Sequence, residues 1–538
     1  MTLKRVIRCR IKPYIQPFER RLAVAELETL SGGSVRPIEL IPNTAEEFEA
    51  ESSTSSLATL ASKLAYWEAV IDGSRHLTIQ TLREATVNIA RNGVALEEIQ
   101  SRLPFREGDV PVPNRRCLRY GTHGIHEYRG KFFPQLVRAL LNIARVPPGG
   151  VVADPMCGSG TTLVEGVLAG DNAIGLDANP LSVAISRTKC GLLRVGPGDL
   201  IDVYEHVRDA LLDLRLGNRA SSLIHFKKLD DRDRGYLHAW YSDQVLVDLD
   251  TIIQVISSTK EGALRDFLRI SLSNILRKVS WQKSDDLRVR KEVRLDVEID
   301  PIREFLEELG RSVRLLLAFL RQNEGTPVGS FQVIEGDARE LQRYWEKWRG
   351  RADTVITSPP YATALPYIDT DRLSLCYLNL LTRPEHRKRD LLMVGNREVT
   401  ERVRKEYWSF FLDHRNILPK SVVNLILHIE RLNRQHEVGF RRHNLPALLS
   451  KYFFDMRQVL CGIFQLLKPG AEAFVVVGNN HTFAGGKRVE IETAKLLSGI
   501  AETLGFKQGA PLAMEMLVSR DIFKRNAVGS ESILRFRK

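Results

Sequence analysis

A short apolar run that ends in an acid, followed by a glycine loop and a helical pattern, constrains the fold of this chain more than any other feature. The run 151–153 ends in Asp154, and Gly158 and Gly160 follow before the apolar helical pattern of residues 163–168. Glycine lets backbone N–H groups approach a ligand closely, and the helix N-terminus behind them favours a carboxylate or a phosphate.

A second apolar run completes this unit. Residues 173–176 end in Asp177, a placement that suits the two hydroxyls of a ribose. The order of strand, glycine loop, helix, strand and acid predicts one half of an α/β fold that binds a nucleoside cofactor. A loop of the nucleotide-hydrolase type is not predicted, because no Lys follows Gly160 and because Phe132 stands after Lys131 where Ser or Thr is needed.

Another signal lies further along the chain, where the apolar run 353–357 is followed by Ser358, Pro359, Pro360 and Tyr361. The two prolines fix φ and remove two N–H donors, so this turn offers a hydroxyl and carbonyl oxygens as acceptors beside an aromatic ring. The exocyclic amine of a flat base needs such acceptors. Taken alone, the same four residues could equally be a turn that ends a strand.

With these residues in view, the chain resembles the DNA amino-methyltransferases, which use S-adenosylmethionine to modify the exocyclic amine of cytosine or adenine. The resemblance rests on the loop 154–162, on the turn 358–361 and on residues 126–134, which look like the family's element at the methionine end of the cofactor. A long segment separates the loop from the turn, as in family members that carry an inserted domain there.

The resemblance implies a set of residues around S-adenosylmethionine. Asp177 would bind the ribose, and Asp337, at the end of a third strand, would contact the adenine amine. The implied cofactor-binding residues are Lys131, Phe132, Asp154, Pro155, Cys157, Gly158, Ser159, Gly160, Thr161, Thr162, Asp177 and Asp337.

The implied catalytic residues are Ser358, Pro359, Pro360 and Tyr361. The target base must flip out of the duplex, because its amine is otherwise paired and out of reach of the methyl group. Tyr361 would stack on the flipped ring, while Ser358 and the carbonyl of Pro359 accept hydrogens from the amine. Ser at position 358 favours the N4 amine of cytosine, since the resemblance places Asp or Asn there in many adenine-modifying members; the N6 amine of adenine stays as the alternative.

Two other functions stay open. An RNA guanine-N2 methyltransferase shares the cofactor loop and a Pro-Pro-Tyr turn, although Asp or Asn usually precedes the prolines in such enzymes. A non-catalytic nucleic-acid-binding subunit could retain the fold, but the intact turn and both ligand acids argue against it.

Charge and cysteine usage indicate which partners and which cellular compartment to expect. The 538 residues carry a formal charge of +12, which favours an anionic partner such as nucleic acid. The six cysteines form no CxxC pair and none follows a proline, so we expect a reducing cytoplasm, no structural zinc and no Pro-Cys nucleophile. No run approaches the roughly 18 apolar residues of a membrane span. The predicted partners are duplex DNA with a flipped target base and, from the resemblance, a companion restriction endonuclease, with neither metal nor membrane.

The predicted fold class is α/β, a Rossmann-like methyltransferase sheet with a helical insert and an additional N-terminal domain. The expected segments are 1–115, an N-terminal domain of unknown role; 116–195, the cofactor-binding half of the core; 196–327, the helical insert; 328–381, the catalytic half; 382–444, a basic arm; and 445–538, the C-terminal part of the core. The insert and the arm are the candidates for DNA contact.

The N-terminal segment gives mixed signals. Its basic start, residues 4–12, is more typical of a solvated tail than of a phosphate contact. Helices are predicted near residues 57–71 and 78–90. A helix pair around Gly93 leaves open a DNA-reading helix-turn-helix, although ordinary helical packing produces the same pattern.

The insert and the arm differ in their patterns. Apolar residues recur every three and four positions over 264–279 and 302–320, which predicts two buried helices joined by a polar connection with Trp281 among cations. That connection is either a nucleic-acid contact or a solvated loop. Residues 382–444 hold 14 Arg or Lys and 8 Asp or Glu, hence an excess of +6, half of the chain's charge. We expect them to contact phosphates, for example through residues 387–389.

The remaining predictions concern the core. They are a third strand over 331–337, a fourth over 353–357, an apolar helix over 373–381, a helix over 452–467 that stops at 468–470, a fifth strand over 473–478, a helix from Ile491, and an antiparallel edge hairpin near Leu512 and Ile533.

Overall fold

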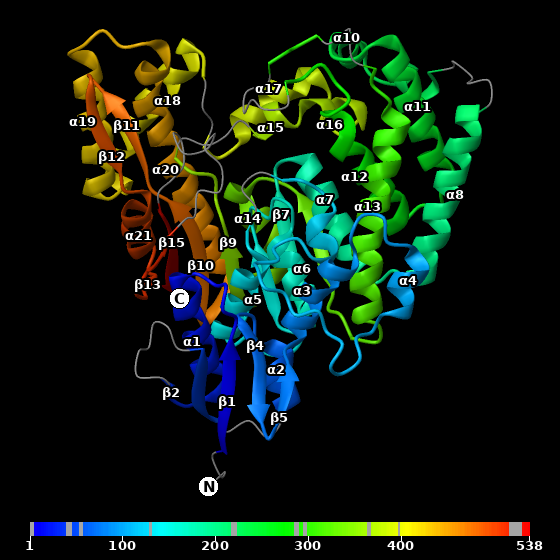
Figure 1. Ribbon diagram of the computed structural model, residues 1–538. Coiled ribbons are helices and arrows are strands. Elements are labelled where there is room, and N and C mark those ends of the chain that lie inside the picture. The colour runs from blue at the N-terminus through cyan, green and yellow to red at the C-terminus, as the bar shows by residue number, and fades with distance from the viewer. Residues whose placement is uncertain are drawn as a thin grey trace.

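A computed structural model describes residues 5–38, 46–52, 57–128, 132–216, 223–283, 290–293, 298–362, 367–395, 399–515 and 530–538. Figure 1 shows a central sheet with a smaller sheet below it, a group of helices on one side, and a lobe of helices with a hairpin on the other.

The central sheet has eight strands in the order β13-β15-β10-β9-β6-β7-β8, with β14 paired to β15. The strands are β6 (Val151–Asp154), β7 (Asn172–Asp177), β8 (Phe331–Glu335), β9 (Ala352–Thr357), β10 (Leu467–Gly478), β13 (Lys507–Gln508), β14 (Leu512–Glu515) and β15 (Ser530–Arg537). Strands β6 to β10 are parallel, and β15 runs antiparallel to β10. The predicted fold class is confirmed.

The strand order changes direction between β6 and β9. From β6 the chain continues outward to β7 and β8, whereas β9 and β10 lie on the other side of β6. In open α/β sheets ligands bind at the carboxyl ends of the strands at such a point. The loop after β6 and the turn after β9 therefore meet where a ligand is expected.

Helices cover both faces of this sheet. They are α5 (Pro134–Ile143), α6 (Thr161–Leu168), α7 (Pro180–Leu192), α14 (Leu341–Trp345), α20 (Phe440–Leu466) and α21 (Thr493–Thr503). Helix α20 begins twelve residues before the predicted start at 452, and the predicted stop at 468–470 lies inside β10 instead. Pro446 cannot donate to the carbonyl of Arg442, and the Asn433 side chain donates to that oxygen instead, at 2.8 Å.

The N-terminal residues form a five-stranded sheet in the order β2-β3-β1-β4-β5. Its elements are β1 (Arg5–Ile11), α1 (Pro17–Ser31), β2 (Val35–Pro37), β3 (Glu47–Ser52), α2 (Leu57–Lys63), β4 (Trp67–Asp72), β5 (Ser74–Leu77), α3 (Ile79–Ile89) and α4 (Leu96–Ser101). The sheet shares one hydrophobic cluster with Val152 of β6, Ile356 of β9 and Phe474 of β10, so it packs on one face of the central sheet.

Two predictions for this region are wrong. The basic start is not a solvated tail, because Ile7, Cys9 and Ile11 are buried on one face of β1 while the arginines alternate with them. Lys12 is also buried, and its Nζ lies 2.7 Å from a carboxylate oxygen of Glu84. The helix predicted over 57–71 ends at residue 63, and the β-branched and aromatic residues after it form β4.

In the described part of the insert between β7 and β8, on the right of Figure 1, the chain forms six helices. They are α8 (Pro197–Leu216), α9 (Ile224–Lys227), α10 (Asp231–His238), α11 (Asp243–Ser258), α12 (Ala263–Leu276) and α13 (Pro301–Gln322). Both predicted apolar stripes are buried in one cluster, which Ile89 and Ile99 of the helix pair around Gly93 join. Part of the polar connection, 284–289, lies outside the described residues; Lys291 Nζ lies 4.8 Å from the ring centroid of Trp281.

Helices follow the turn of residues 358–361, first short ones and then those of the arm of residues 382–444, and a hairpin lies beside the arm. The elements are α15 (Tyr367–Thr370), α16 (Arg372–Tyr377), α17 (Arg383–Leu392), α18 (Glu401–His414), α19 (Lys420–Arg434), β11 (Asn480–Ala484) and β12 (Lys487–Ile491). The predicted helix over 373–381 is thus shorter, and the one predicted from Ile491 starts two residues later. Among the described helices, none is both long enough and apolar enough to cross a membrane.

Candidate cofactor and catalytic site

A pocket opens at the carboxyl ends of β6 to β9, where the strand order changes direction. It encloses about 780 Å³, part of which is open solvent. The predicted residues that line it are Phe132, Asp154, Pro155, Cys157, Gly158, Ser159, Thr161, Asp177, Asp337, Ser358 and Pro360.

Four other predicted residues adjoin the pocket without being part of its described lining: Gly160, Thr162, Pro359 and Tyr361. Thr162 is fully buried, and its hydroxyl donates to the carbonyl of Ile356 at 3.1 Å. It therefore fixes α6 against β9 beneath the pocket. Lys131 lies outside the described residues.

Two glycines shape the loop after β6. Gly158 and Gly160 have φ values of +49° and +78°, a region that side chains other than glycine rarely adopt. A Cβ on Gly158 would lie 3.0 Å from the ring of Tyr128, and one on Gly160 would lie 2.8 Å from the Ser186 hydroxyl oxygen. Space and backbone conformation both require glycine here.

Asp177 joins the end of β7 to this loop. Its carboxylate oxygens accept hydrogen bonds from the backbone N–H groups of Gly158 and Asn179, each at 2.8 Å. Burial raises the pKa of Asp177 to about 6, although these N–H groups act in the opposite direction. Burial likewise raises the pKa of Asp154 to about 7, while the Met156 N–H donates to it at 3.1 Å. Two buried acids thus face the same cavity.

Asp337 follows β8 at one end of the pocket. Arg339 donates to both of its oxygens, with Nε lying 2.9 Å from Oδ1 and 3.0 Å from Oδ2. Partial burial alone would raise the pKa of Asp337, but the hydrogen bonds and charge of Arg339 outweigh it and lower the pKa. Asp337 is therefore an ionised acceptor near neutral pH.

The turn after β9 is held by the strands beside it. The Ser358 hydroxyl donates to the carbonyl of Val476 in β10 at 3.2 Å. The hydroxyl of Tyr361 donates to the carboxylate of Glu531 in β15. Burial raises the pKa of Glu531, and the bond from Tyr361 partly offsets this effect.

Seven lining residues were absent from the predicted set: Tyr128, Met156, Ala178, Ala338, Leu392, Met393 and Val394. Tyr128 and Met156 lie within the segments that carried the resemblance. Residues 392–394 come from the end of α17, and no motif marks them. Arg389 holds this helix end to the core, since it donates to the Ala178 carbonyl and to Glu335, both at 2.6 Å.

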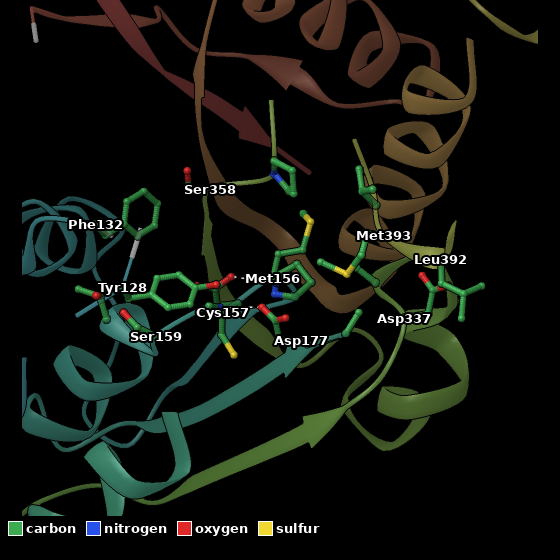
Figure 2. A pocket seen from close by; sticks show the side chains of 18 residues that line it. Tyr128, Phe132, Met156, Cys157, Ser159, Asp177, Asp337, Ser358, Leu392 and Met393 are labelled. Atoms are coloured by element: carbon green, nitrogen blue, oxygen red, sulfur yellow. Dashed lines mark hydrogen bonds between the residues drawn. The ribbon is translucent and has the colours of Figure 1, made fainter. Parts of the chain in front are cut away.

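Figure 2 shows how the lining is arranged. Tyr128 and Phe132 lie at one end of the pocket, Asp337 and Met393 lie at the other, and Asp177 lies between them. Ser358 projects from a separate side, directly after strand β9. The pocket is therefore elongated, with an acid in its middle and another at one end.

The contacts of Arg389 do not fit the expectation that residues 387–389 contact phosphates. Arg387 and Lys388 are exposed, but Arg389 is engaged with Glu335 and the core, so it cannot be counted as a free cation. Other cations of the arm pair along their own helices, as Arg402 does with Glu406 and Lys405 with Glu401. Within the described part of the chain, no His, Cys, Asp and Glu side chains are grouped as a metal site requires.

The strand order and this pocket fit a Rossmann-like methyltransferase core that uses S-adenosylmethionine. A family model, UPF0020, described as an RMKL-like methyltransferase domain, matches residues 126–190, which include the glycine loop and Asp177. The chain is 26% identical over 392 residues to the type II methyltransferase M.MvaI of Kocuria varians, across 70% of this chain and 80% of that protein.

Two further relatives bear on the substrate. The type II methyltransferase M.BsoBI of Geobacillus stearothermophilus is 23% identical over 435 residues, 73% of this chain and 81% of that protein. The tRNA (guanine(10)-N2)-dimethyltransferase of Methanocaldococcus jannaschii is 28% identical over 174 residues, which are 32% of this chain and 40% of that protein. Similarity to the type II enzymes thus extends over most of the chain, and similarity to the tRNA enzyme over about a third.

Proposed function

We propose that this protein transfers a methyl group from S-adenosylmethionine to the exocyclic amine of a base in duplex DNA, with the N4 amine of cytosine as the target. The observation that carries this proposal is the hydrogen bond from the Ser358 hydroxyl to the Val476 carbonyl. A carbonyl can only accept, so the hydroxyl hydrogen is committed to the protein. The lone pairs of Ser358 are then available to accept from an amine.

The pocket fits the cofactor along its length. Asp177, in the middle, would accept from the ribose hydroxyls in addition to its two backbone donors. Asp337, ionised at one end, would accept from the adenine amine. Tyr128 and Phe132, at the other end, would surround the methionine part, whose carboxylate suits the loop that precedes helix α6 (Figure 2).

The residues of the turn would prepare the amine as a nucleophile. When bound, S-adenosylmethionine supplies an electrophilic methyl group on a sulfonium. Ser358 and the carbonyl of Pro359 would each accept a hydrogen bond from the amine. These two bonds would draw the nitrogen lone pair out of conjugation with the ring. The nitrogen would then take up this methyl group, sulfur would keep the electron pair of the carbon–sulfur bond, and the surplus amine proton would leave to solvent. Positioning supplies most of the rate enhancement, because no covalent enzyme intermediate is needed.

Tyr361 would hold the flipped base. Glu531 accepts a hydrogen bond from its hydroxyl, which fixes the ring at its far edge, and the ring would stack on the flipped base. The arm of residues 382–444 and the insert of residues 196–327 are the proposed DNA contacts on either side. Similarity to type II methyltransferases over most of the chain supports duplex DNA as the substrate and a companion restriction endonuclease as the second partner.

Two alternatives have specific support. The N6 amine of adenine presents the same hydrogens, and a hydroxyl can accept from either base. A tRNA guanine-N2 activity is supported by the relative that matches a third of the chain. Ser at position 358, where Asp or Asn is usual in such RNA enzymes, favours DNA over the second alternative.

A competition assay tests the proposal. The protein is incubated with S-adenosylmethionine labelled in its methyl group, together with duplex DNA of mixed sequence and total tRNA in equal mass. We expect label in DNA, and we expect unlabelled duplex to compete while unlabelled tRNA does not. Label confined to tRNA would refute the proposal. A Ser358→Ala variant is the matched control, because it removes the acceptor and leaves Asp154, Asp177 and Asp337 of the pocket unchanged.

A further inference from the structure

Four charged side chains of alternating sign run from the cofactor pocket into helix α20. Arg339 donates to Asp337 through Nε, and its Nη1 lies 3.1 Å from Oδ1 of Asp455. Lys451, one helical turn before Asp455, donates to its other carboxylate oxygen. Arg339 thus bonds both Asp337 of the pocket and Asp455 of α20. Lys451 is the second partner of Asp455.

The same lysine also reaches the wall of the pocket. Its Nζ lies 3.3 Å from the carbonyl oxygen of Met393, which it can donate to. Met393 lines the pocket with its neighbours 392 and 394, at the end where Asp337 lies (Figure 2). One side chain therefore contacts both the charge network of Asp337 and the main chain of the facing wall.

These groups are costly to bury. Side chains of Lys451 and Asp455 are only 9% and 8% exposed. Replacing a buried ion pair by apolar residues is often neutral or stabilising, so stability alone does not explain the pair. Removing one member leaves a buried charge without one of its partners. Without Lys451, the carboxylate of Asp455 would draw Arg339 away from Asp337.

We propose that Lys451, acting through Asp455 and Arg339, is a positioning residue for the adenine end of the cofactor. It keeps the Asp337 carboxylate aimed at the adenine amine and holds the Met393 wall at the same end of the pocket. This inference rests on the proposed function, because it requires the pocket to bind an adenosyl group.

The test measures recognition of the adenine amine without DNA and without turnover. Isothermal titration gives the Kd of S-adenosylhomocysteine and of its deaminated analogue, in which an oxo group replaces the amine. Wild-type protein is expected to prefer the amine form by about tenfold or more, the fold-change that one hydrogen bond to a charged group supplies. Lys451→Met is expected to bind S-adenosylhomocysteine about tenfold more weakly and to lose most of this preference, because the two changes are coupled.

Three variants sharpen the result. Lys451→Arg keeps the charge and should keep the preference. Lys451→Gln keeps a donor for the Met393 carbonyl but removes the charge; it should lose the preference, and it serves as the second test if Lys451→Met does not fold. Lys495→Met removes a lysine of α21 that is 77% exposed and whose Nζ lies 3.6 Å from Oε2 of Glu492. This variant should change neither Kd.

Two outcomes would overturn the inference, and they are distinguishable. If both neutral Lys451 variants keep the wild-type preference for the amine form, Lys451 does not position Asp337, while the proposed function stands. If wild-type protein binds neither ligand, the proposed function fails and this inference fails with it.

Discussion

The glycine loop after β6 and the arm of residues 382–444 both carry charge, but they hold it differently. Asp154 and Asp177 beside the loop are buried, and main-chain N–H groups bond each of them. In the arm, Arg402 and Lys405 are 86% and 69% exposed and pair with carboxylates one helical turn away.

This difference determines what each region reveals about function. A buried acid must have fixed partners, so its position in the pocket restricts its role. An exposed ion pair contributes only about 0–1 kcal/mol, so an exposed cation can exchange its partner for a phosphate at little cost. The excess positive charge of the arm therefore indicates an anionic partner without identifying the contacting residues, whereas the fixed hydrogen bonds of Asp154 and Asp177 restrict what these two acids can bind.

The largest effect is expected at the turn between these two regions. Tyr361→Ala should lower methyl transfer by about 100-fold or more, because the flipped base loses its support. The affinity for S-adenosylmethionine should stay nearly unchanged, since Tyr361 is not part of the described pocket lining. Single-turnover rates and calorimetric titration measure the two quantities. Tyr361→Phe, which keeps the ring and loses the bond to Glu531, should show a smaller loss; equal loss of rate and affinity in Tyr361→Ala would mean that the turn is structural.

Asp177→Ala tests the buried half of the comparison. Loss of the Asp177 carboxylate should weaken S-adenosylmethionine binding by about 1–3 kcal/mol, the range for leaving buried polar groups without their partner. Part of this loss reflects the loop, because Gly158 also donates to Asp177. Calorimetric titration of the folded variant decides, and an unchanged affinity would refute the ribose assignment.

The arm is tested by the salt dependence of DNA binding. Arg387→Ala/Lys388→Ala should lower the slope of log affinity against log salt by roughly two, about 0.9 per lost phosphate contact. Arg343→Ala/Lys347→Ala removes the same charge from exposed positions near α14 and should leave the slope unchanged. If both double variants change the slope equally, the effect comes from net charge and not from the arm.

The smallest expected effect is a pH dependence of cofactor binding. Burial raises the pKa of Asp177 to about 6, and ribose hydroxyls donate only to acceptors, so the ionised form is the binding form. Affinity should therefore be complete above about pH 7 and fall by about tenfold between pH 8 and pH 5, since protonation then competes with binding. Titrations across this range measure it. The decline should disappear in Asp177→Asn; a decline that persists there would point to Asp154 instead.

The sequence predicted those parts of the site whose chemistry is local. The acids at strand ends, the two glycines and the Ser358 turn lie within short segments whose order along the chain matches the fold. Residues 392–394 could not be predicted, because they reach the pocket through helix α17 and the contacts of Arg389 and Lys451. Such contacts leave no periodicity or motif.

The error at the N-terminus has a different origin. Residues 7–11 alternate between apolar and charged side chains, which is the period of a strand with one buried face. Charge density favoured a solvated tail, but the apolar face of β1 is covered by the rest of the N-terminal core. The alternation was the better signal, because burial of one face decides whether such a segment is ordered.

The central claim is the identity of the modified atom. Duplex DNA of mixed sequence is incubated with the protein and S-adenosylmethionine, digested to nucleosides and resolved by mass spectrometry against synthetic standards. The account predicts N4-methylcytosine, absent when Ser358→Ala replaces the wild-type protein. Methyl groups on adenine N6 with none on cytosine would contradict the cytosine assignment, and unmodified DNA beside methylated tRNA guanine would contradict the account as a whole.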